Sequence, residues 1–194
     1  CCKAWMLLMM PDAWRRPYDY SRSNEGRFPM PNHPHITGKH VLVTGAGGSI
    51  GGALCERLLA LAPARLVLLN LTEHGLVQAQ RRLRPQDGTI IQGVLGSVTD
   101  EAVLARLLPG IHVVIHAAAH KHVPLGETCP AAFVSTILGG TRAVCLAARR
   151  AGAQRVLVIS TDKAVQPASI MGASKFLAER LVSGLGAGFL AVRF

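Results

Sequence analysis

Six short apolar runs, rich in β-branched residues, alternate with segments of helical character from Lys39 to the end of the chain. The runs occupy residues 40–44, 65–70, 89–94, 112–116, 155–160 and 189–193. The helical segments occupy residues 49–60, 73–83, 100–108, 130–150 and 170–183. Because the runs are continuous and do not alternate with polar residues, they indicate strands buried on both faces of a parallel sheet. With right-handed crossovers this order predicts an α/β fold, a doubly wound parallel sheet of about six strands.

Residues with known positional preferences mark the ends of these helices. Thr72 and Thr99 precede helical segments, where a hydroxyl can cap the free backbone N–H groups. Pro130 suits a first helical turn, and Gly152 and Gly184 follow predicted helix ends. The residues at the helix ends therefore agree with the boundaries that the hydrophobic pattern predicts.

Composition excludes several classes of protein. The 194 residues are 49% hydrophobic and 16% charged, which rules out a wholly disordered chain and predicts one domain, or one domain plus a tail. No apolar run reaches the roughly 18 residues that a membrane-spanning helix needs. Five cysteines, an odd number without a Cys-x-x-Cys pair, argue against a disulfide scaffold or a zinc site and favour a reducing cytosol.

The first 38 residues differ from the rest of the chain. Five prolines interrupt every candidate element there, so we expect residues 1–37 to form a poorly ordered tail or linker before a domain at 38–194. Most of the net charge of +10 lies in that domain, which suits an anionic ligand. Only Arg81, Arg82 and Arg84 cluster, and no aromatic residues lie between them, so we expect no nucleic acid partner.

A glycine-rich loop follows the first predicted strand and opens the first predicted helix, which is the context of a phosphate-binding turn. Gly45 permits the tight turn, Gly48 lets the backbone approach a pyrophosphate, and Gly51 allows close helix packing. Free N–H groups at the helix start hold the anion. The loop predicts a Rossmann-like, NAD(P)-binding domain. Its cofactor-binding residues are Gly45, Gly47, Gly48, Ser49, Ile50 and Gly51.

The second predicted strand ends in Asn70, where NAD-binding proteins carry an acid that accepts from the ribose 2′-hydroxyl. Asparagine can hydrogen-bond a hydroxyl, and it does not repel a 2′-phosphate as an aspartate would. The sequence therefore predicts NAD or NADP as the cofactor and leaves the choice between them open.

Four further segments carry a more specific resemblance. They read His-Ala-Ala-Ala-His-Lys-His-Val-Pro at 116–124, Gly-Thr at 140–141, Ile-Ser-Thr-Asp-Lys-Ala-Val at 159–165 and Met-Gly-Ala-Ser-Lys at 171–175. With the glycine loop they make residues 38–194 resemble the CapD-like polysaccharide-biosynthesis proteins. These form the UDP-N-acetylglucosamine 4,6-dehydratase branch of the extended short-chain dehydrogenase/reductase family.

The resemblance implies a chemistry in three stages. A nucleotide-sugar is oxidised at C4 by hydride transfer to the bound nicotinamide, water leaves across C5–C6, and the hydride returns to C6. Elimination needs one group that donates a proton and another that accepts one. By resemblance Asp162 is the acid, Lys163 is the base and Thr161 holds the C4 oxygen.

Met171 and Lys175 stand four residues apart, on one face of a helix. This is the superfamily's Tyr-x-x-x-Lys spacing with methionine in place of tyrosine, as in larger, membrane-attached members of the family. A thioether cannot transfer a proton, so C4 oxidation needs another base, whereas Lys175 is expected to hydrogen-bond the nicotinamide ribose.

The resemblance also assigns the remaining site residues. Ala117, Ala118, Ala119 and Ser97 are expected to contact the cofactor, and Lys121 and His122 the substrate. No carboxylate or cysteine joins the histidines of 116–122, so we expect no metal site.

Three positions depart from the family pattern. The family usually has aspartate at Asn70 and Ser97, and asparagine at Ile137. That asparagine shapes the middle of a helix and a proton path, which we do not expect isoleucine to do.

Two other functions stay open. A nucleotide-sugar 4-epimerase shares the loop but would carry tyrosine at 171, and an inactive or truncated dinucleotide-binding module would carry the fold alone. The chain ends at Phe194, where the family continues into the segment that grips the nucleotide-sugar, so we expect the C-terminal substrate subdomain to be missing. The resemblance implies cytoplasmic work at the inner membrane face, membrane association through a missing N-terminal region, and a homo-oligomer that binds UDP-N-acetylglucosamine.

Overall fold

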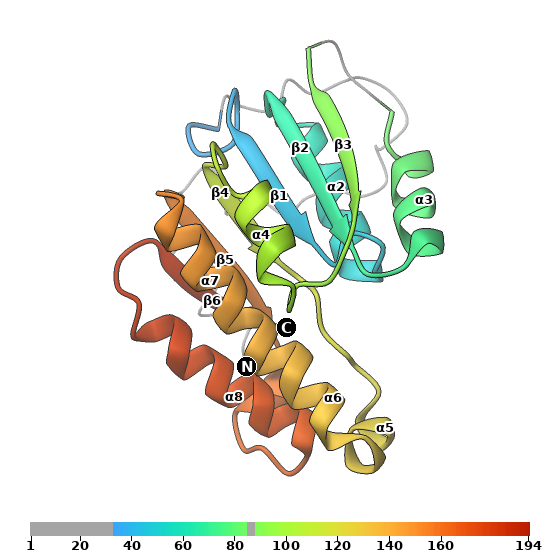
Figure 1. Cartoon of the computed structure of the whole chain (residues 1–194), viewed down its shortest axis with the longest axis vertical. Helices are drawn as coiled ribbons and strands as arrows, with labels where there is room; N and C mark the ends of the chain where they lie inside the picture. Colours follow the sequence, from blue (N-terminus) through green and yellow to red (C-terminus); the bar gives the residue numbers. More distant parts are fainter. Residues whose placement is uncertain (1–32, 85–87) are drawn as a thin grey trace, which may run out of the picture.

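A computed structural model describes residues 33–84 and 88–194, and in these residues one sheet of six parallel strands forms the centre of the fold (Figure 1). The strand order is β3-β2-β1-β4-β5-β6. The strands are β1 (His40–Thr44), β2 (Arg65–Asn70), β3 (Ile90–Leu95), β4 (Val113–His116), β5 (Arg155–Ser160) and β6 (Phe189–Arg193). The predicted doubly wound sheet is confirmed, and each strand lies within one residue of its predicted bounds.

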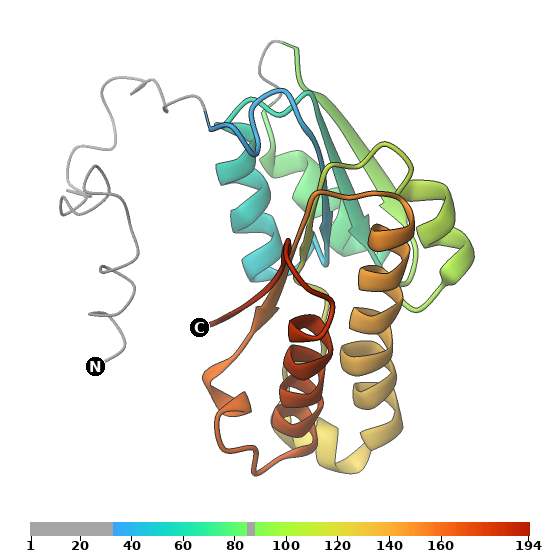
Figure 2. The ribbon, with the colours of Figure 1, turned by 90° about the vertical axis from the view of Figure 1, so that its left-hand side faces the viewer.

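Helices cover both faces of the sheet. They are α2 (Ser49–Leu59), α3 (Glu73–Arg82), α4 (Glu101–Leu107), α5 (Val123–Thr128), α6 (Pro130–Val134), α7 (Gly140–Arg150) and α8 (Ile170–Ser183). A π-helical segment η3 (Ser135–Gly139) joins α6 to α7, and a 3-10 turn η4 (Asp162–Ala164) follows β5. Figure 2 shows α2 on one side of the sheet and α4 and α7 on the other.

Alternate residues of each strand supply two separate cores. Val41 and Val43 of β1 pack with α2 and α3, whereas Leu42 between them packs with α4 and α7. This two-faced burial explains why the strands are apolar without alternation.

The N-terminal boundary of the domain lies before residue 38. Ile36 is buried in the α2-side core, and Thr37 Oγ1 donates to the Leu61 carbonyl at 3.0 Å. Residues 33–37 therefore pack onto the domain, although they fall within the predicted tail. Residues 1–32 lie outside the described residues, and the tail stays a prediction there.

Two helix predictions need correction. Asp100, and not Thr99, caps α4, because its carboxylate accepts from the N–H groups of Ala102 and Val103. The helix predicted at 130–150 is interrupted by η3. The structure also contains α5, which the sequence did not predict.

One helical stretch, Pro130–Arg150, is long and apolar enough to pass a simple test for a membrane span. Within the described residues it packs against α4, α8, β4 and β5, as a core helix of a globular domain does.

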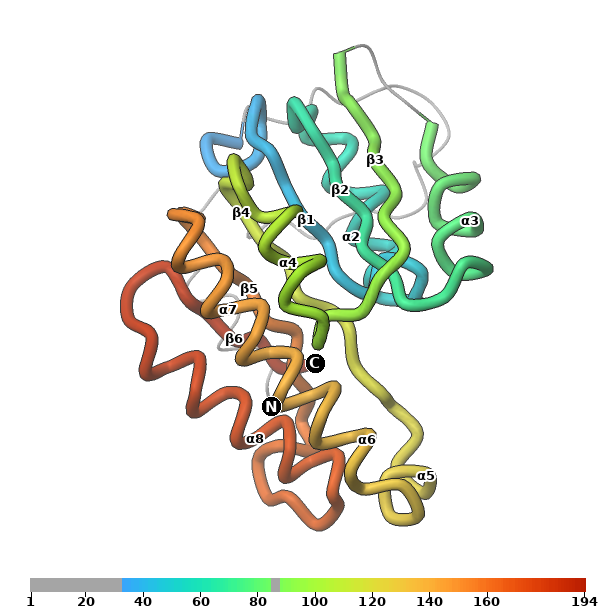
Figure 3. Tube along the Cα trace, viewed as in Figure 1, coloured from blue at the N-terminus to red at the C-terminus, as the bar shows by residue number. Residues whose placement is uncertain are grey.

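The strand order reverses between β1 and β4, which pair directly. In an open α/β sheet, ligands bind at the carboxyl ends of the strands beside such a reversal. Figure 3 traces the chain from β4 past this point to α5, and from β2 toward α3. The fold therefore places the loops after β1, β2, β4 and β5 around one region.

Candidate functional site

The glycine loop after β1 is packed too closely for side chains. Gly45 has φ +67°, and a Cβ there would lie 2.7 Å from the Ala118 backbone. A Cβ at Gly51 would lie 2.1 Å from the Gly45 carbonyl oxygen. The tight turn and the close helix packing predicted from the sequence are both present.

The N-terminus of α2 opens toward the loop without a protein anion. Gly48 is the N-cap, no side chain in the described part of the chain caps the helix, and its first turn carries no acid. The first N–H groups of a helix lack intrahelical acceptors, and the helix dipole favours negative charge there. Together with the glycine backbone, this end of α2 fits the pyrophosphate of a dinucleotide.

Asn70 at the end of β2 fastens the loop to the rest of the fold. Its Oδ1 accepts from the Gly47 N–H at 3.0 Å, and its Nδ2 donates to the Thr72 carbonyl at 2.9 Å. Thr72 in turn accepts from the Gly75 N–H and caps α3, as predicted. Both ends of the Asn70 amide therefore have protein partners before any ligand binds.

Two cavities meet at the carboxyl ends of the strands. One, here called the Asn70 cavity, has a volume of about 290 Å³. The other, here called the Lys175 cavity, has a volume of about 510 Å³. Both are lined by Gly48, Ala117, Ala119 and His120, so they form two halves of one site.

Nearly all of the predicted site residues line this pair of cavities. The Asn70 cavity holds Gly45, Asn70, Ser97 and Ala118. The Lys175 cavity holds Ser49, Ile50, Gly51, Lys121, His122, Thr161, Lys163, Met171 and Lys175. Gly47 and Asp162 line neither cavity: the first lies behind the loop against Gly75, and the second has a side chain 75% exposed.

The Thr161–Lys163 turn stands at the carboxyl end of β5. Thr161 Oγ1 donates to Asp162 Oδ1 at 3.0 Å, and Lys163 Nζ lies 3.5 Å from the same oxygen. The hydrogen bond from Thr161 and the charge of Lys163 hold the pKa of Asp162 below its usual range. This open arrangement keeps Asp162 ionised, whereas a proton donor must carry a proton.

Lys175 is buried behind the turn on α8. Its Nζ donates to the Ile159 carbonyl at 2.6 Å, and burial lowers the pKa of this amine to about 8. Met171, one turn earlier, packs with Phe133 and Ile137 in a small apolar cluster. An apolar pair thus occupies the two positions where the superfamily places tyrosine and asparagine.

The π-helical segment forms although position 137 is isoleucine. Thr141 Oγ1 donates to the Ile137 carbonyl at 2.5 Å, within the irregular turn. The helix is therefore irregular around Ile137 in this structure, while the expectation that isoleucine cannot take the place of asparagine in a proton path stays a prediction.

His116 is buried among three elements. Its Nδ1 lies 2.7 Å from Thr44 Oγ1, and its Nε2 lies 3.2 Å from Thr141 Oγ1. Since Thr141 donates its one proton to the Ile137 carbonyl, the imidazole must donate through Nε2 and accept from Thr44. Burial lowers the pKa of His116 to about 3, so the ring is neutral.

The other histidines of this stretch lie apart from that ring. His120 and His122 line the Lys175 cavity, and His120 also stacks against Phe133. Within residues 33–84 and 88–194, no group of three or more His, Cys, Asp or Glu side chains is arranged to hold a metal ion.

Several residues of the site carry no clear sequence signal. Phe194 lines the Lys175 cavity, and its backbone oxygen accepts from the Asp162 N–H at 3.0 Å. Thr136 of η3 reaches the Asn70 cavity. Both come from elements whose approach to the site depends on tertiary structure, which a local pattern does not encode.

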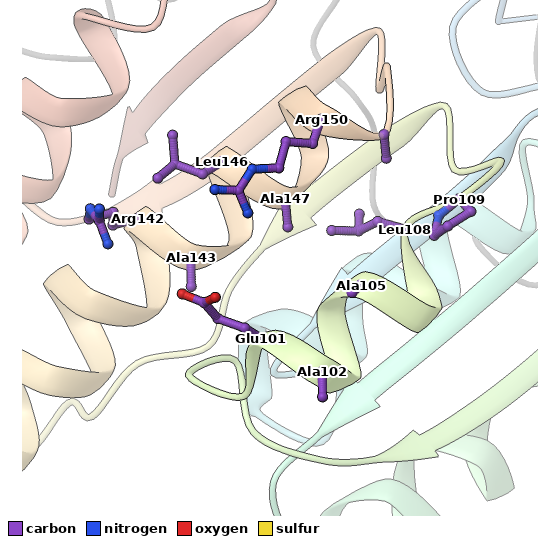
Figure 4. Close-up of a pocket in the computed structure, with 11 residues that line it drawn as sticks. Glu101, Ala102, Ala105, Leu108, Pro109, Arg142, Ala143, Leu146, Ala147 and Arg150 are labelled. Carbon is purple, nitrogen blue, oxygen red and sulfur yellow. The ribbon is translucent and has the colours of Figure 1, made fainter.

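A separate groove of about 520 Å³ lies between α4 and α7 (Figure 4). Its floor is formed by alanine and leucine side chains, with Glu101, Arg142 and Arg150 at its edges. None of the predicted site residues lies in it.

Comparison with known proteins identifies the family. Residues 41–193 match the polysaccharide biosynthesis protein family. The chain is 41% identical over 167 residues to the "Probable polysaccharide biosynthesis protein EpsC" of Bacillus subtilis, and 35% identical over 168 residues to the capsular polysaccharide biosynthesis protein CapD of Staphylococcus aureus. Each alignment covers 82% of this chain and 28% of the relative.

Other relatives bear the names of two activities. The UDP-N-acetylglucosamine 4,6-dehydratase (inverting) of Campylobacter jejuni strain 81-176 is 30% identical over 147 residues, covering 75% of this chain and 43% of that protein. UDP-glucose 4-epimerases of Rickettsia species match at 30% to 32% identity. The chain therefore spans less than half the length of these curated relatives.

Solved structures agree on the fold. Pen from Bacillus thuringiensis matches with a TM-score of 0.75 and 28% identity, over 82% of this chain and 50% of that one. A DesIV double mutant, a dTDP-glucose 4,6-dehydratase from Streptomyces venezuelae with NAD and DAU bound, matches with a TM-score of 0.71 and 25% identity, over 79% of this chain and 55% of that one. The chain belongs to the polysaccharide biosynthesis protein family, in the CapD-like branch of the extended short-chain dehydrogenases/reductases.

Proposed function

We propose that this chain is the cofactor-binding half of a nucleotide-sugar 4,6-dehydratase of the UDP-N-acetylglucosamine class, in polysaccharide biosynthesis. One observation carries the proposal: the Thr161–Lys163 turn opens onto the same cavity as Lys175 and the uncapped N-terminus of α2. A cofactor bound at the helix end and a nucleotide-sugar beside the turn would then lie next to each other in this cavity. The relatives named as dehydratases support the same assignment.

The paired cavities fit an NAD or NADP molecule laid across the end of the sheet. The Asn70 cavity suits the adenosine half, and the helix end between the cavities suits the pyrophosphate. A nicotinamide group, when bound, supplies the acceptor and later the donor of the hydride. In this proposal Lys175, whose Nζ donates to the Ile159 carbonyl, also donates to a ribose hydroxyl of the cofactor.

The turn after β5 supplies the elimination chemistry in this proposal. Lys163 takes the C5 proton, and Asp162 gives a proton to the C6 hydroxyl, which leaves as water as the C5–C6 double bond forms. Thr161 holds the C4 oxygen. Since Asp162 is ionised in the open site, its donor role requires that bound substrate shield it from water and raise its pKa.

Lys121 and His122 extend the Lys175 cavity toward α5, where they suit the sugar or its diphosphate. Met171 has no exchangeable proton, so the proton of the C4 hydroxyl leaves to another group in this cavity.

A 4-epimerase is the second candidate, because Rickettsia relatives carry that name. Epimerisation returns the hydride to C4 and needs no proton donor at C6. The acid–lysine pair at Asp162 and Lys163 therefore has a use in dehydration that it lacks in epimerisation.

We further propose that the protein works in the cytoplasm at the inner membrane face, as a homo-oligomer. The resemblance implies a supply of activated sugars for surface polysaccharide, and a relative in Methanocaldococcus jannaschii is named an uncharacterized membrane protein.

A product assay tests the function. The chain is incubated with UDP-N-acetylglucosamine and NAD in deuterated water, and the nucleotide-sugars are read by NMR. A 4-keto-6-deoxy product with deuterium at C5 supports dehydration. A C4 epimer supports the second candidate, and cofactor binding without either product identifies a non-catalytic module.

Lys163→Ala tests the base. We expect C5 proton exchange with solvent to fall at least about 100-fold, since one general base contributes a factor of about 10² to 10⁴. Cofactor affinity stays unchanged. Lys39→Ala, which removes a lysine at the opposite end of β1, serves as the control and keeps full exchange. Normal exchange in Lys163→Ala would remove this lysine from the base role.

A further inference from the structure

Glu179 lies one turn beyond Lys175 on α8, where the ends of β5 and β6 come together. Its carboxylate accepts from Ser160 Oγ and from the Nε–Nη2 edge of the Arg193 guanidinium. Arg193 Nε lies 2.9 Å from Oε1 and 3.1 Å from Oε2, and Nη2 lies 2.5 Å from Oε2. Because Ser160 and Arg193 are register partners across the two strands, one carboxylate joins α8 to both.

The two partners of this carboxylate flank the turn after β5. Ser160 is the residue immediately before Thr161. Arg193 is followed by Phe194, whose backbone oxygen accepts from the Asp162 N–H at 3.0 Å. The turn is therefore held before Thr161 through Ser160, and at Asp162 through the Arg193–Phe194 segment.

The Glu179 carboxylate also affects the protonation of the buried Lys175 amine. Lys175 is 7% exposed, and its Nζ has the neutral Ile159 carbonyl as its hydrogen-bond acceptor. Burial lowers the pKa of Lys175, and the charge of Glu179 opposes that change. The hydrogen bond from Arg193 holds the pKa of Glu179 below its usual range, so Glu179 stays ionised.

Other titratable groups surround this pair. His116 at the end of β4 is neutral, so it adds no second positive charge near Lys175. Charged side chains on further elements that pack against α8 are Glu127 of α5, Asp162 and Lys163 of η4, Arg155 of β5, and Arg142, Arg149 and Arg150 of α7. Of these, Asp162 pairs with Lys163, and Glu127 accepts from the N–H of Ile170.

We propose that Glu179 is a positioning residue: its carboxylate, held by Ser160 and Arg193, fixes the Thr161–Lys163 turn beside Lys175 and places a negative charge one helical turn from that buried amine. The bracket formed by Glu179, Ser160 and Arg193 explains how an exposed 3-10 turn is held beside a buried helix. Only the use of the turn in catalysis rests on the proposed function.

The charge is tested by titrating Lys175 directly. Acetylation of its amine by acetic anhydride is followed against pH by peptide mass spectrometry, with Lys39 as an internal reference. In Glu179→Gln, which keeps the shape of the side chain, we expect the midpoint of Lys175 to fall by about one pH unit. Glu56→Gln, which removes an exposed carboxylate on α2, is the control and leaves the midpoint of Lys175 unchanged.

The bracket is tested by amide hydrogen exchange of the peptide that contains Asp162. We expect about tenfold faster exchange at this amide in Glu179→Gln, and a similar increase in Ser160→Ala, which removes one arm and leaves the Arg193 pair. Unchanged exchange in both variants, or an unmoved Lys175 midpoint in folded Glu179→Gln, overturns the proposal. Ser160→Ala decides the matter if Glu179→Gln does not fold.

Neither measurement requires turnover. A chain that makes no 4-keto-6-deoxy sugar yet shows both shifts keeps the bracket and refutes the proposed function. If the chain is active, Glu179→Gln lowers kcat about tenfold with little change in KM. If Glu179 served folding alone, the pH profile of kcat would be the same in Glu179→Gln as in the parent chain. If its charge acts on Lys175, the part of the profile that follows the titration of Lys175 shifts to lower pH.

Discussion

Asn70 uses both ends of its carboxamide within the protein. It accepts from the glycine loop through Oδ1 and donates to Thr72 through Nδ2. An aspartate could keep the first bond, but it could not donate to the Thr72 carbonyl. The residue therefore holds the loop in place and leaves the adjoining cavity without a formal negative charge at this position.

This neutrality predicts how Asn70→Asp alters cofactor choice. A carboxylate beside the cavity repels a 2′-phosphate and accepts from a 2′-hydroxyl. We expect the ratio of the NADPH and NADH dissociation constants to rise about tenfold, equivalent to about 1.4 kcal/mol. Fluorescence titration with both cofactors measures it.

Gln154→Glu is the matched control, because it adds the same charge at an exposed position just before β5, at the end of the strands away from the cavities. An unchanged ratio in Asn70→Asp would show that the 2′-position lies away from this residue.

At the scale of the element, α2 owes its role to what its first turn lacks. No acid or capping side chain meets its N-terminus within the described residues, and Gly48 leaves the approach open. A side chain at position 48 would begin 3.2 Å from the Gly45 carbonyl oxygen and project over the helix end.

Gly48→Val tests this opening. We expect NADH to bind at least about 100-fold more weakly, because the valine side chain occupies the space that a pyrophosphate needs. Isothermal titration calorimetry measures the loss. Gly52→Ala, one turn further along α2 and with ordinary contacts of 3.6 Å, is expected to bind normally. Equal NADH affinities in Gly48→Val and Gly52→Ala would show that the glycine loop does not bind the cofactor.

The elements that the sequence predicts well are those with local causes. Strand burial, the glycine turn and the Thr72 cap follow from residues that are neighbours in the chain. Helix α5 is only six residues long and carries no hydrophobic period, so its pattern is too short to recognise. At α4 two adjacent residues could both cap, and the stronger acceptor, Asp100, does so.

The site was predictable to the extent that its residues lie in continuous motifs. The strings around Ala117, Thr161 and Lys175 converge on two adjoining cavities because each follows or faces a strand end. Phe194 and Glu179 were missed. They reach the site through pairing of β5 with β6 and through α8 packing, and neither relation leaves a local pattern.

For the whole molecule, His116 sits where the two halves of the sheet meet. Its ring joins the end of β1 to the junction of η3 and α7 through two threonines. An imidazole that must stay neutral in this position makes the entire fold sensitive to acid.

The sign of that sensitivity follows from the pKa of His116, about 3 in the folded chain against an ordinary 6.5. Between these values the unfolded chain binds a proton that the folded chain does not, so stability falls as the pH drops below 6.5. The contribution lost by pH 3.5 is on the order of 4 kcal/mol.

His116→Gln removes this dependence while keeping a polar side chain between the threonines. We expect its free energy of unfolding to change less between pH 7 and pH 4 than that of the parent chain, measured by urea titration. His74→Gln, an exposed position on α3, keeps the parent's slope. A parallel loss of stability in both variants and the parent would assign the acid sensitivity to other groups.

The pairing of β1 with β4 has a consequence for how the chain is made. Thr44 and His116 are 72 residues apart, although their strands are adjacent. At about 5 to 20 residues per second, a ribosome takes roughly 4 to 14 seconds to deliver β4 after β1. During that interval the side of β1 that will pair with β4 has no hydrogen-bond partner, and the glycine turn lacks its contact with Ala118. The centre of the sheet, and with it the nucleotide-binding end, therefore closes only after β4 has been made.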